Sequence, residues 1–203
     1  SLHDALPIFR EAVSKLKGNT SSQIYAGVEM VIRCSDGNPR RFISILNSLY
    51  LASSDEEGFK QVPYSIQDRL LRHFSNNEYR RIISEPGQGD GIHKALSIIG
   101  KYFKDCLHHR PLSTDLVLSF RYNVDDPEIW SVVSEAVGLG LIRPLVEKTQ
   151  LDELPVKSGT FRLSYMLSPH FLLLPRRGKS VSLSSILNGD SASGLSTQQM
   201  ELI

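Results

Sequence analysis

A short turn between two amphipathic segments is the feature that most constrains how this chain folds. Ser21 to Ser35 places apolar residues at helical spacing, and Phe42 to Tyr50 does the same downstream. Between them, Gly37 is suited to end the first helix, Asn38 to cap the second and Pro39 to occupy its first turn. The pattern therefore predicts two amphipathic helices joined by a tight turn.

The first turn of the second helix carries a candidate phosphate contact. Arg40 falls at the edge of the apolar stripe, so its guanidinium is expected to project from the helix N-terminus without being buried. Backbone N–H groups at a helix N-terminus favour anions, and a guanidinium matches the geometry of phosphate. Arg41 is the neighbour that could substitute for it. The alternative is that both arginines are simply solvated.

The first eight residues predict an unusual origin for the N-terminus. Ser1 to Ile8 can be back-translated as TCCCTACACGACGCTCTTCCGATC, which looks like the end of a common sequencing adapter. The chain has no initiator Met, and Pro7 would disrupt a helix running into Phe9. We therefore expect residues 1–8 to be non-biological and the rest to be a fragment whose N-terminal part is missing.

Composition places the chain among ordinary globular proteins. Its 203 residues, 40% hydrophobic and 22% charged, suit one large domain or two small ones. A net charge of +1 means that any basic surface must be local. Cys34 and Cys106 have no spaced partners, which argues against a zinc site or disulfides and favours the cytoplasm. No apolar run is long enough for a membrane span.

Turn residues divide the chain into two predicted domains. Residues 9–85 read as helices throughout, with a short one at Phe9 to Lys17 and two more at Ser65 to Phe74 and Asn77 to Ser84. Residues 86–91, Pro-Gly-Gln-Gly-Asp-Gly, combine breakers with no apolar residue and form the expected linker. The second domain covers 92–187, and the Ser- and Gly-rich residues 188–203 are expected to be a disordered tail.

The second domain shows the pattern of a winged helix. A helix from Ile92 to His108 precedes an alternating strand from Leu116 to Tyr122, and Asp125 to Glu128 opens a helix that ends at Gly138. Leu141 to Glu147 and Thr160 to Met166 read as two strands joined by a polar loop. The expected fold class is mainly α, with a three-stranded sheet confined to residues after about 115.

The sequence lacks the motifs of known catalytic centres. It contains no G-x-x-x-x-G-K-[ST] phosphate loop, no H-E-x-x-H and no G-x-S-x-G. Asp125 and Asp126 resemble a carboxylate pair, but helix capping explains them. We expect no catalytic residue and no metal site in this chain, and neither ATP hydrolysis nor appreciable ATP binding by the chain alone.

Two stretches resemble the back half of bacterial AAA+ ATPases similar to the origin-recognition class. The sharper is Ser35 to Phe42, and the second is Phe161 to Pro169, continuing through Pro175 to Lys179 and Val181 to Leu183. The resemblance covers roughly residues 9–188. It implies that residues 9–85 are a helical lid bearing a sensor-2 arginine and that residues 92–187 are a winged-helix domain.

The resemblance also implies roles and partners. Arg40, or Arg41 in its place, would contact the γ-phosphate of ATP bound by a missing N-terminal AAA+ core. ATP and Mg²⁺ would be cofactors of the intact parent and not of the fragment alone, and the parent could be an oligomer. The phosphate loop and the Walker-B acids fall outside this sequence. Because the γ-phosphate holds lid and core together, hydrolysis would move the winged helix.

The partner of the winged helix is left open between DNA and protein. The helix from Glu128 to Gly138 carries two acids and no Lys or Arg, so its field repels phosphate. Basic candidates for DNA contact lie around and after the hairpin: Arg143, Lys157, Arg162, Arg176, Arg177 and Lys179. A nucleotide-switched DNA-binding ATPase is slightly favoured over a signalling ATPase that docks a protein. A stand-alone winged-helix regulator is the third possibility.

Overall fold

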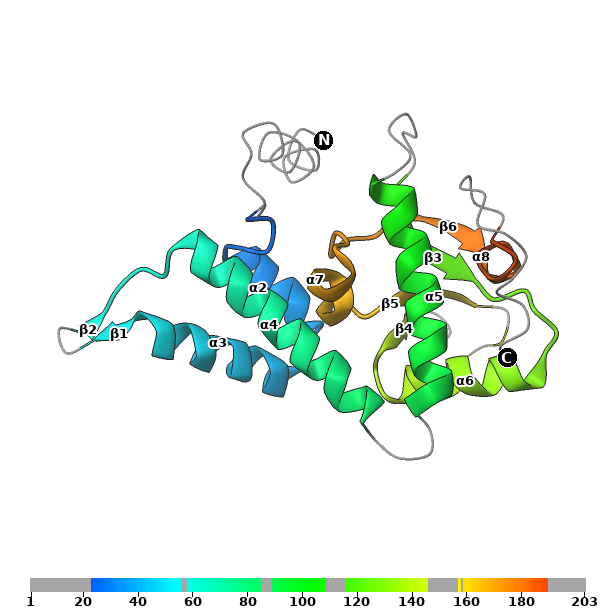
Figure 1. Ribbon diagram of the computed structural model, residues 1–203, viewed down its shortest axis with the longest axis horizontal. Coiled ribbons are helices and arrows are strands. Elements are labelled where there is room, and N and C mark those ends of the chain that lie inside the picture. Colours follow the sequence, from blue (N-terminus) through cyan, green and yellow to red (C-terminus); the bar gives the residue numbers. More distant parts are fainter. Residues whose placement is uncertain are drawn as a thin grey trace. The chain divides into compact units, whose positions relative to one another are not determined.

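The computed structural model describes residues 23–55, 58–84, 89–108, 116–145, 157 and 159–189. The chain divides into two compact units, unit 1 (Ser1–Asn77) and unit 2 (Glu78–Ile203), which are described separately. The division falls inside helix α4 (Tyr64–Ile83), so the last turns of α4 belong to unit 2 (Figure 1). The predicted helix at Phe9 to Lys17 and residues 190–203 of the predicted tail lie outside the described residues.

Unit 1 contains the predicted pair of helices, α2 (Val28–Ser35) and α3 (Pro39–Ser53). Asp36 and Gly37 adopt left-handed conformations, with φ of 52° and 72°, and end α2. The Asn38 side-chain oxygen accepts hydrogen bonds from the N–H groups of Arg40 and Arg41, at 3.0 and 3.3 Å. The predicted turn and cap are therefore confirmed. A small antiparallel pair, β1 (Ser54–Asp55) and β2 (Gly58–Phe59), follows α3.

The first helix begins later than the sequence pattern predicts. It starts at Val28 and not at Ser21, because the segment before it is tied to α4 by side chains. The N–H of Tyr25 donates to Asp68 Oδ1 at 2.9 Å, and the N–H of Gly27 donates to Gln67 Oε1 at 2.8 Å. Backbone groups satisfied in this way have no need of a helical partner.

The two short helices predicted at Ser65 to Phe74 and Asn77 to Ser84 are one continuous helix, α4. Ser75, Asn76 and Asn77 have modest helix propensity, but none is a Gly or Pro that would end a helix. Ser75 is buried, and the Asn77 side chain hydrogen-bonds the His73 ring at 2.9 Å one turn earlier. Tertiary packing and this side-chain bond therefore carry the helix through the polar stretch.

The core of unit 1 is small and combines all three helices with the segment before α2. Its buried members are Tyr25, Val31, Cys34, Ile45 and Leu71. The predicted apolar stripes are only partly covered, since several large apolar side chains are exposed in the described structure: Val28, Ile32, Ile43, Leu46, Tyr50, Leu51 and Tyr64.

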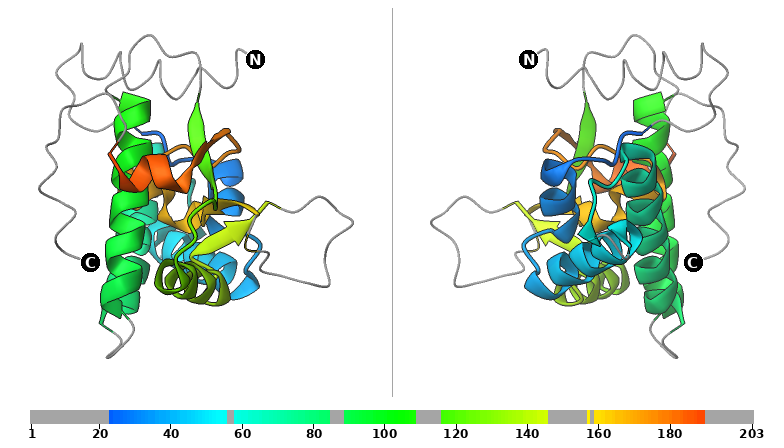
Figure 2. Two further views of the ribbon diagram at one scale, coloured as in Figure 1. Left: turned by 90° about the vertical axis from the view of Figure 1, so that its right-hand side faces the viewer. Right: turned by 90° about the vertical axis from the view of Figure 1, so that its left-hand side faces the viewer.

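Unit 2 is built around a four-stranded sheet in the order β4-β5-β3-β6. Its elements include α5 (Gly89–His108), β3 (Val117–Arg121), α6 (Pro127–Gly138), β4 (Ile142–Pro144) and β5 (Thr160–Leu163). They continue with a 3-10 turn (Tyr165–Leu167), α7 (Ser168–Phe171), β6 (Lys179–Ser182) and α8 (Leu183–Leu187). Figure 2 shows α5 and β4 on opposite sides of this unit. The predicted helix, strand, helix and hairpin are confirmed, in a winged-helix type fold.

Two details of unit 2 differ from the sequence prediction. The sheet has a fourth strand, because β6 pairs in parallel with β3. Gly178 permits this approach: a Cβ there would lie 2.4 Å from the Leu116 carbonyl oxygen, which instead accepts the N–H of Lys179 at 2.7 Å. In addition, Gly89 to Gly91, which were expected in the linker, form the first turn of α5.

Aromatic side chains dominate the core of unit 2. Phe120 of β3 stacks on Phe161 of β5 with ring centroids 5.7 Å apart, and Trp130 of α6 meets Phe161 edge-on at 6.3 Å. Both phenylalanines are fully buried. Asp126 caps α6 by accepting the N–H groups of Glu128 and Ile129, as the acidic opening predicted. The aromatic contacts fix α6 and the β4–β5 hairpin against β3.

Candidate functional site

The structure places the sensor-2 candidate Arg40 on the surface of unit 1, in the first turn of α3. Its guanidinium makes no hydrogen bond or ion pair with any residue that the structure describes. The backbone N–H groups of Arg40 and Arg41, which the sequence suggested as phosphate donors, are already bound by Asn38. Any phosphate contact at this turn therefore has to come from the Arg40 side chain.

Arg41 is less suited to the same task. Its side chain is half-buried, and its Nη1 atom is shielded from solvent. A guanidinium held in this way lacks the freedom to follow a ligand that arrives from outside unit 1. The structure thus separates two arginines that the sequence left as near equivalents.

A face of the unit 2 sheet brings basic residues together. In the antiparallel β4–β5 pair, Arg143 lies directly opposite Arg162. Residues opposite each other in a sheet project to the same face, and like charges in that position destabilise the pair. This face is opposite to the one that carries Phe161, because successive residues of a strand alternate.

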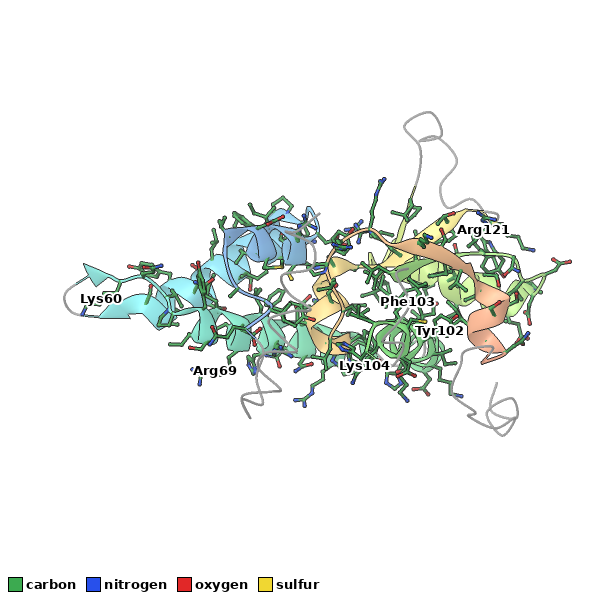
Figure 3. All side chains as sticks on the ribbon, turned by 90° about the horizontal axis from the view of Figure 1, so that it is seen from above. Lys60, Arg69, Tyr102, Phe103, Lys104 and Arg121 are labelled. Carbon is green, nitrogen blue, oxygen red and sulfur yellow. The ribbon has the colours of Figure 1, made fainter. Side chains whose placement is uncertain are left out.

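Arg121 belongs to the same face and was not identified from the sequence. It ends β3 and pairs with Thr160, which precedes Arg162 by two residues on β5. Arg121 therefore projects to the face shared by Arg143 and Arg162, and it is exposed (labelled in Figure 3). The signal was present in the alternation of residues 116–122, but only the strand register connects it to the hairpin. We refer to Arg121, Arg143 and Arg162 as the arginine face.

One member of the arginine face is held in place by an aromatic ring. The Arg162 guanidinium lies 3.7 Å from the centroid of the Tyr165 ring, and its Nη1 donates to the Leu163 carbonyl at 3.0 Å. A cation–π contact and a hydrogen bond together restrict the orientation of this guanidinium. Arg162 is therefore preorganised to meet an anion.

The other predicted DNA contacts are less uniform. Lys157 is exposed and pairs with Asp125 at 3.1 Å, an exposed ion pair of the kind that contributes little. Arg177 and Lys179 are both exposed. Arg176 differs, since its Nε and Nη1 are shielded from solvent and it lines a small pocket with Phe103 and Leu118. That packing gives Arg176 a structural role within unit 2.

The helix α6 presents a different surface. A shallow open groove runs along it, lined by Pro127, Trp130, Ser131, Ser134 and Glu135. The groove contains no Lys or Arg, in agreement with the acidic character expected from the sequence. It has no feature that would favour the major groove of DNA over a protein surface.

Metal ions and thiols of low pKa are two common sources of reactivity in proteins. The described residues contain no group of three or more His, Cys, Asp or Glu side chains placed to hold a metal ion. Cys34 and Cys106 are buried and form no disulfide, and burial, together with the nearby Asp36, raises the pKa of Cys34 to about 12. A thiol with such a pKa is a poor nucleophile at neutral pH. Within the same described part, no helix has the length and apolarity to cross a membrane.

Comparison with protein families decides the assignment that the sheet and helices left open. The ORC-CDC6-like family model matches residues 5–183, a range that covers most of both units. The chain belongs to the ORC-CDC6-like family. It is thus related to AAA+ ATPases, as the resemblance of residues 35–42 and 161–183 implied. Comparisons with curated proteins and with solved structures gave no match.

Membership of the ORC-CDC6-like family supports only some of the predictions made from the sequence. The bacterial class, the adapter origin of residues 1–8 and the boundaries of the predicted domains stay predictions. The sensor-2 role of Arg40 and the DNA contacts stay predictions as well.

Proposed function

We propose that this ORC-CDC6-like chain is the lid and winged-helix portion of an AAA+ ATPase, and that unit 2 binds the DNA backbone through the arginine face. The observation that carries the proposal is the position of Arg143 directly opposite Arg162 with Arg121 on the same face. Three like charges on one face of a sheet repel each other, and a polyanion spanning them removes that repulsion.

The chemistry of the arginine face favours phosphate over bases. Guanidinium groups bind phosphate oxygens through paired N–H donors, and such contacts position a protein on DNA without reading sequence. The acidic residues Glu128 and Glu135 of α6 oppose insertion of that helix into the major groove. The proposed binding is therefore directed to the backbone, with Arg177 and Lys179 as exposed additional contacts.

We further propose that Arg40 contacts the γ-phosphate of ATP bound by an AAA+ core. The exposed, uncommitted guanidinium at the start of α3 fits a terminal phosphate. Bound ATP with its Mg²⁺ supplies the phosphoanhydride bond whose cleavage removes the γ-phosphate. This chain would offer one cation on the lid, and the attraction of that cation for the core-bound nucleotide would weaken when the γ-phosphate leaves.

Charge neutralisation of the arginine face is expected to weaken DNA binding. The variant carries Arg121→Gln, Arg143→Gln and Arg162→Gln, and its affinity for a short labelled duplex should fall by at least about 10-fold at low salt, because each lost guanidinium removes a charge-assisted phosphate contact. The loss should be similar for unrelated duplex sequences. Fluorescence anisotropy on the whole chain measures both effects.

The control is Arg69→Gln, which removes one charge at an exposed arginine of unit 1 and leaves the arginine face intact (labelled in Figure 3). Its DNA affinity should stay close to that of the parent chain. If the triple variant binds DNA as tightly as the control, the arginine face does not contribute to DNA binding.

A protein partner is the second candidate, and the groove along α6 favours it. The groove combines the Trp130 ring with hydroxyl and carboxylate groups and has no cation among its lining residues. Aromatic and polar lining of this kind suits a protein surface better than a nucleic acid. If the parent chain does not bind DNA, the groove along α6 becomes the candidate binding surface of unit 2.

A further inference from the structure

The basic run from Arg176 to Lys179 directly precedes a serine, Ser180, that the proposed function does not use. Two arginines stand four and three residues before this serine, in the pattern Arg-Arg-x-x-Ser. The same pattern occurs at two other places in the chain, where it ends at Ser44 and at Ser84. Protein kinases with acidic substrate clefts select arginines before a serine, because guanidinium groups pair with carboxylates. The sequence therefore offers three candidate phosphorylation sites of one type.

The structure argues against Ser44. This serine lies inside helix α3, and its carbonyl oxygen accepts a hydrogen bond from Ser48 Oγ at 3.0 Å. Arg41, three residues before it, is half-buried, and its Nη1 atom is shielded from solvent. A kinase would have to unwind part of α3 and expose this arginine before it could reach the hydroxyl, which requires local unfolding.

The surroundings of Ser84 are also less suitable. Its hydroxyl donates a hydrogen bond to the Arg81 carbonyl at 2.8 Å, at the end of α4. Arg81 is the arginine three residues before the serine, and its guanidinium pairs with Glu78 at 3.1 Å. Glu85 follows directly in the sequence. Carboxylates next to the serine weaken its attraction to an acidic cleft, because like charges repel.

Ser180 lies in a different local structure. It is exposed on β6, which Figure 1 shows beside β3 and which is the last strand of the described sheet. Its hydroxyl forms no hydrogen bond with any residue that the structure describes, whereas the Ser182 and Ser185 hydroxyls lie 2.6 Å apart. Arg177, three residues before it, is exposed as well. Phosphoryl transfer needs the hydroxyl in line with the γ-phosphorus, and an exposed side chain on extended backbone can take that position.

Ser180 projects to the same side of the sheet as the arginine face. It pairs with Ser119 in the parallel β3–β6 ladder, and Ser119 precedes Arg121 by two residues. The register of β3 and β5 places Ser119 opposite Arg162. From the usual strand spacing and rise, the Cα atom of Ser180 lies about 8 Å from that of Arg121 and about 10 Å from that of Arg162. A phosphate on Ser180 is therefore within reach of both guanidinium groups.

We propose that Ser180 is a phosphorylation site, and that its phosphate pairs with Arg121 and Arg162 and so lowers the affinity of the arginine face for DNA. The modifying enzyme is a protein kinase of the class that selects arginine before serine, with ATP as the phosphoryl donor. Ser180 Oγ attacks the γ-phosphorus, the bond to the departing ADP breaks, and the hydroxyl proton passes to a carboxylate of the kinase.

The charge of the product gives the direction of the effect. A phosphoserine carries a charge of about −1.5 to −2 at pH 7 and offers three acceptor oxygens, so it competes with DNA phosphates for the same guanidinium donors. Lys179 precedes Ser180 and projects to the opposite side of the strand, since successive residues alternate. The effect on DNA rests on the proposed function of the arginine face, whereas the modification and the ion pairing do not.

The site is tested by treating the whole chain with the catalytic subunit of cyclic AMP-dependent protein kinase and Mg-ATP, and by mapping the phosphopeptides with mass spectrometry. Phosphate is expected at Ser180, and it should appear there faster than at Ser44 or Ser84, which carry the same sequence pattern. Ser180→Ala should abolish this main modification. The proposal is overturned if Ser180 is not modified, or if Ser44 or Ser84 is modified at the same rate.

The ion pairing is tested by phosphorus NMR of the phosphorylated chain. Nearby guanidinium groups favour the dianion, so the second pKa of the phosphate should lie below its usual value of about 6. Arg121→Gln should raise this pKa toward about 6. Arg143→Gln removes the same charge two strands further from Ser180, on β4, and should change the pKa less. Equal pKa values in the two variants would show that the phosphate does not pair with Arg121.

The effect on DNA is tested by fluorescence anisotropy with a short labelled duplex. The phosphorylated chain should bind at least about 10-fold more weakly at low salt, because the phosphate occupies two guanidinium groups. Kinase-treated Ser180→Ala is the matched control and should bind as tightly as the untreated parent chain. Equal affinities of the two kinase-treated chains would overturn the regulatory effect. Because the mapping and the NMR need no DNA, a parent chain that fails to bind DNA contradicts the proposed function and not the phosphorylation site.

Discussion

Replacing Phe161 by Ala is expected to lower the free energy of unfolding of unit 2 by about 3–5 kcal/mol, the usual cost of removing a buried phenylalanine. The ring is fully buried, stacks on Phe120 and meets the edge of Trp130. Its loss removes the contact that ties the hairpin to both β3 and α6. A small unit with a free energy of unfolding of about 5–10 kcal/mol would lose much of its stability.

Urea denaturation followed by tryptophan fluorescence measures this effect. Trp130 is the single tryptophan of the chain and lies in unit 2, so the signal reports on that unit. Leu139→Ala, a change at an exposed leucine after α6, is the control and should shift the midpoint much less. If Phe161→Ala shifts the urea midpoint no more than Leu139→Ala does, the described core of unit 2 is contradicted.

The second large effect is expected at Arg40. When this chain is joined to an AAA+ core that binds ATP, Arg40→Ala should reduce ATP hydrolysis by about 10²–10³-fold, the usual effect of removing one preorganised charge donor. The fold should not change, because Arg40 is exposed and Asn38 caps α3 through backbone N–H groups that Ala also possesses. Steady-state hydrolysis with thermal unfolding as a parallel measurement separates the two quantities.

Arg41→Ala and Arg69→Ala are the comparisons for that experiment. Arg69 is exposed on α4 and should have no effect on hydrolysis. Arg41 is half-buried, and its replacement should lower the stability of unit 1 more than the rate. If Arg41→Ala slows hydrolysis in a folded protein while Arg40→Ala does not, the sensor role moves to Arg41.

Local signals in the sequence were sufficient for much of the fold. The Gly37-Asn38-Pro39 turn and the Asp126 cap are confirmed, because both depend on side chains within a few residues of the backbone groups that they satisfy. The strand at 117–121 and the β4–β5 hairpin are confirmed as well, because each strand was recognisable from its own residues. Patterns with a short range in sequence therefore transferred well to the structure.

The features that sequence reasoning missed depend on contacts between distant residues. The late start of α2 depends on Asp68 and Gln67, about forty positions further along the chain. The fourth strand depends on Gly178 approaching Leu116. Arg121 joins Arg143 and Arg162 only through the register of three strands. The periodicity of a single segment carries no information about contacts between residues so far apart in sequence.

The charge at position 176 shows the same limit for a functional site. The sequence groups Arg176 with Arg177 and Lys179 as one basic run. In the structure, Arg176 turns toward the interior beside Phe103, whereas its two neighbours in the run are exposed. Adjacency in sequence therefore predicted a larger basic surface at residues 176–179 than the structure has. The residues of the arginine face are far apart in sequence, and only two of the three were identified from it.

The most direct measurement for the account is the salt dependence of DNA binding by the whole chain, with and without the arginine face. The logarithm of the binding constant should fall linearly with the logarithm of salt concentration, and the Arg121→Gln/Arg143→Gln/Arg162→Gln variant should have a slope flatter by about 2 to 3, in proportion to three lost phosphate contacts. Identical slopes for the variant and the parent chain, or no DNA binding by the parent, would contradict backbone recognition by unit 2.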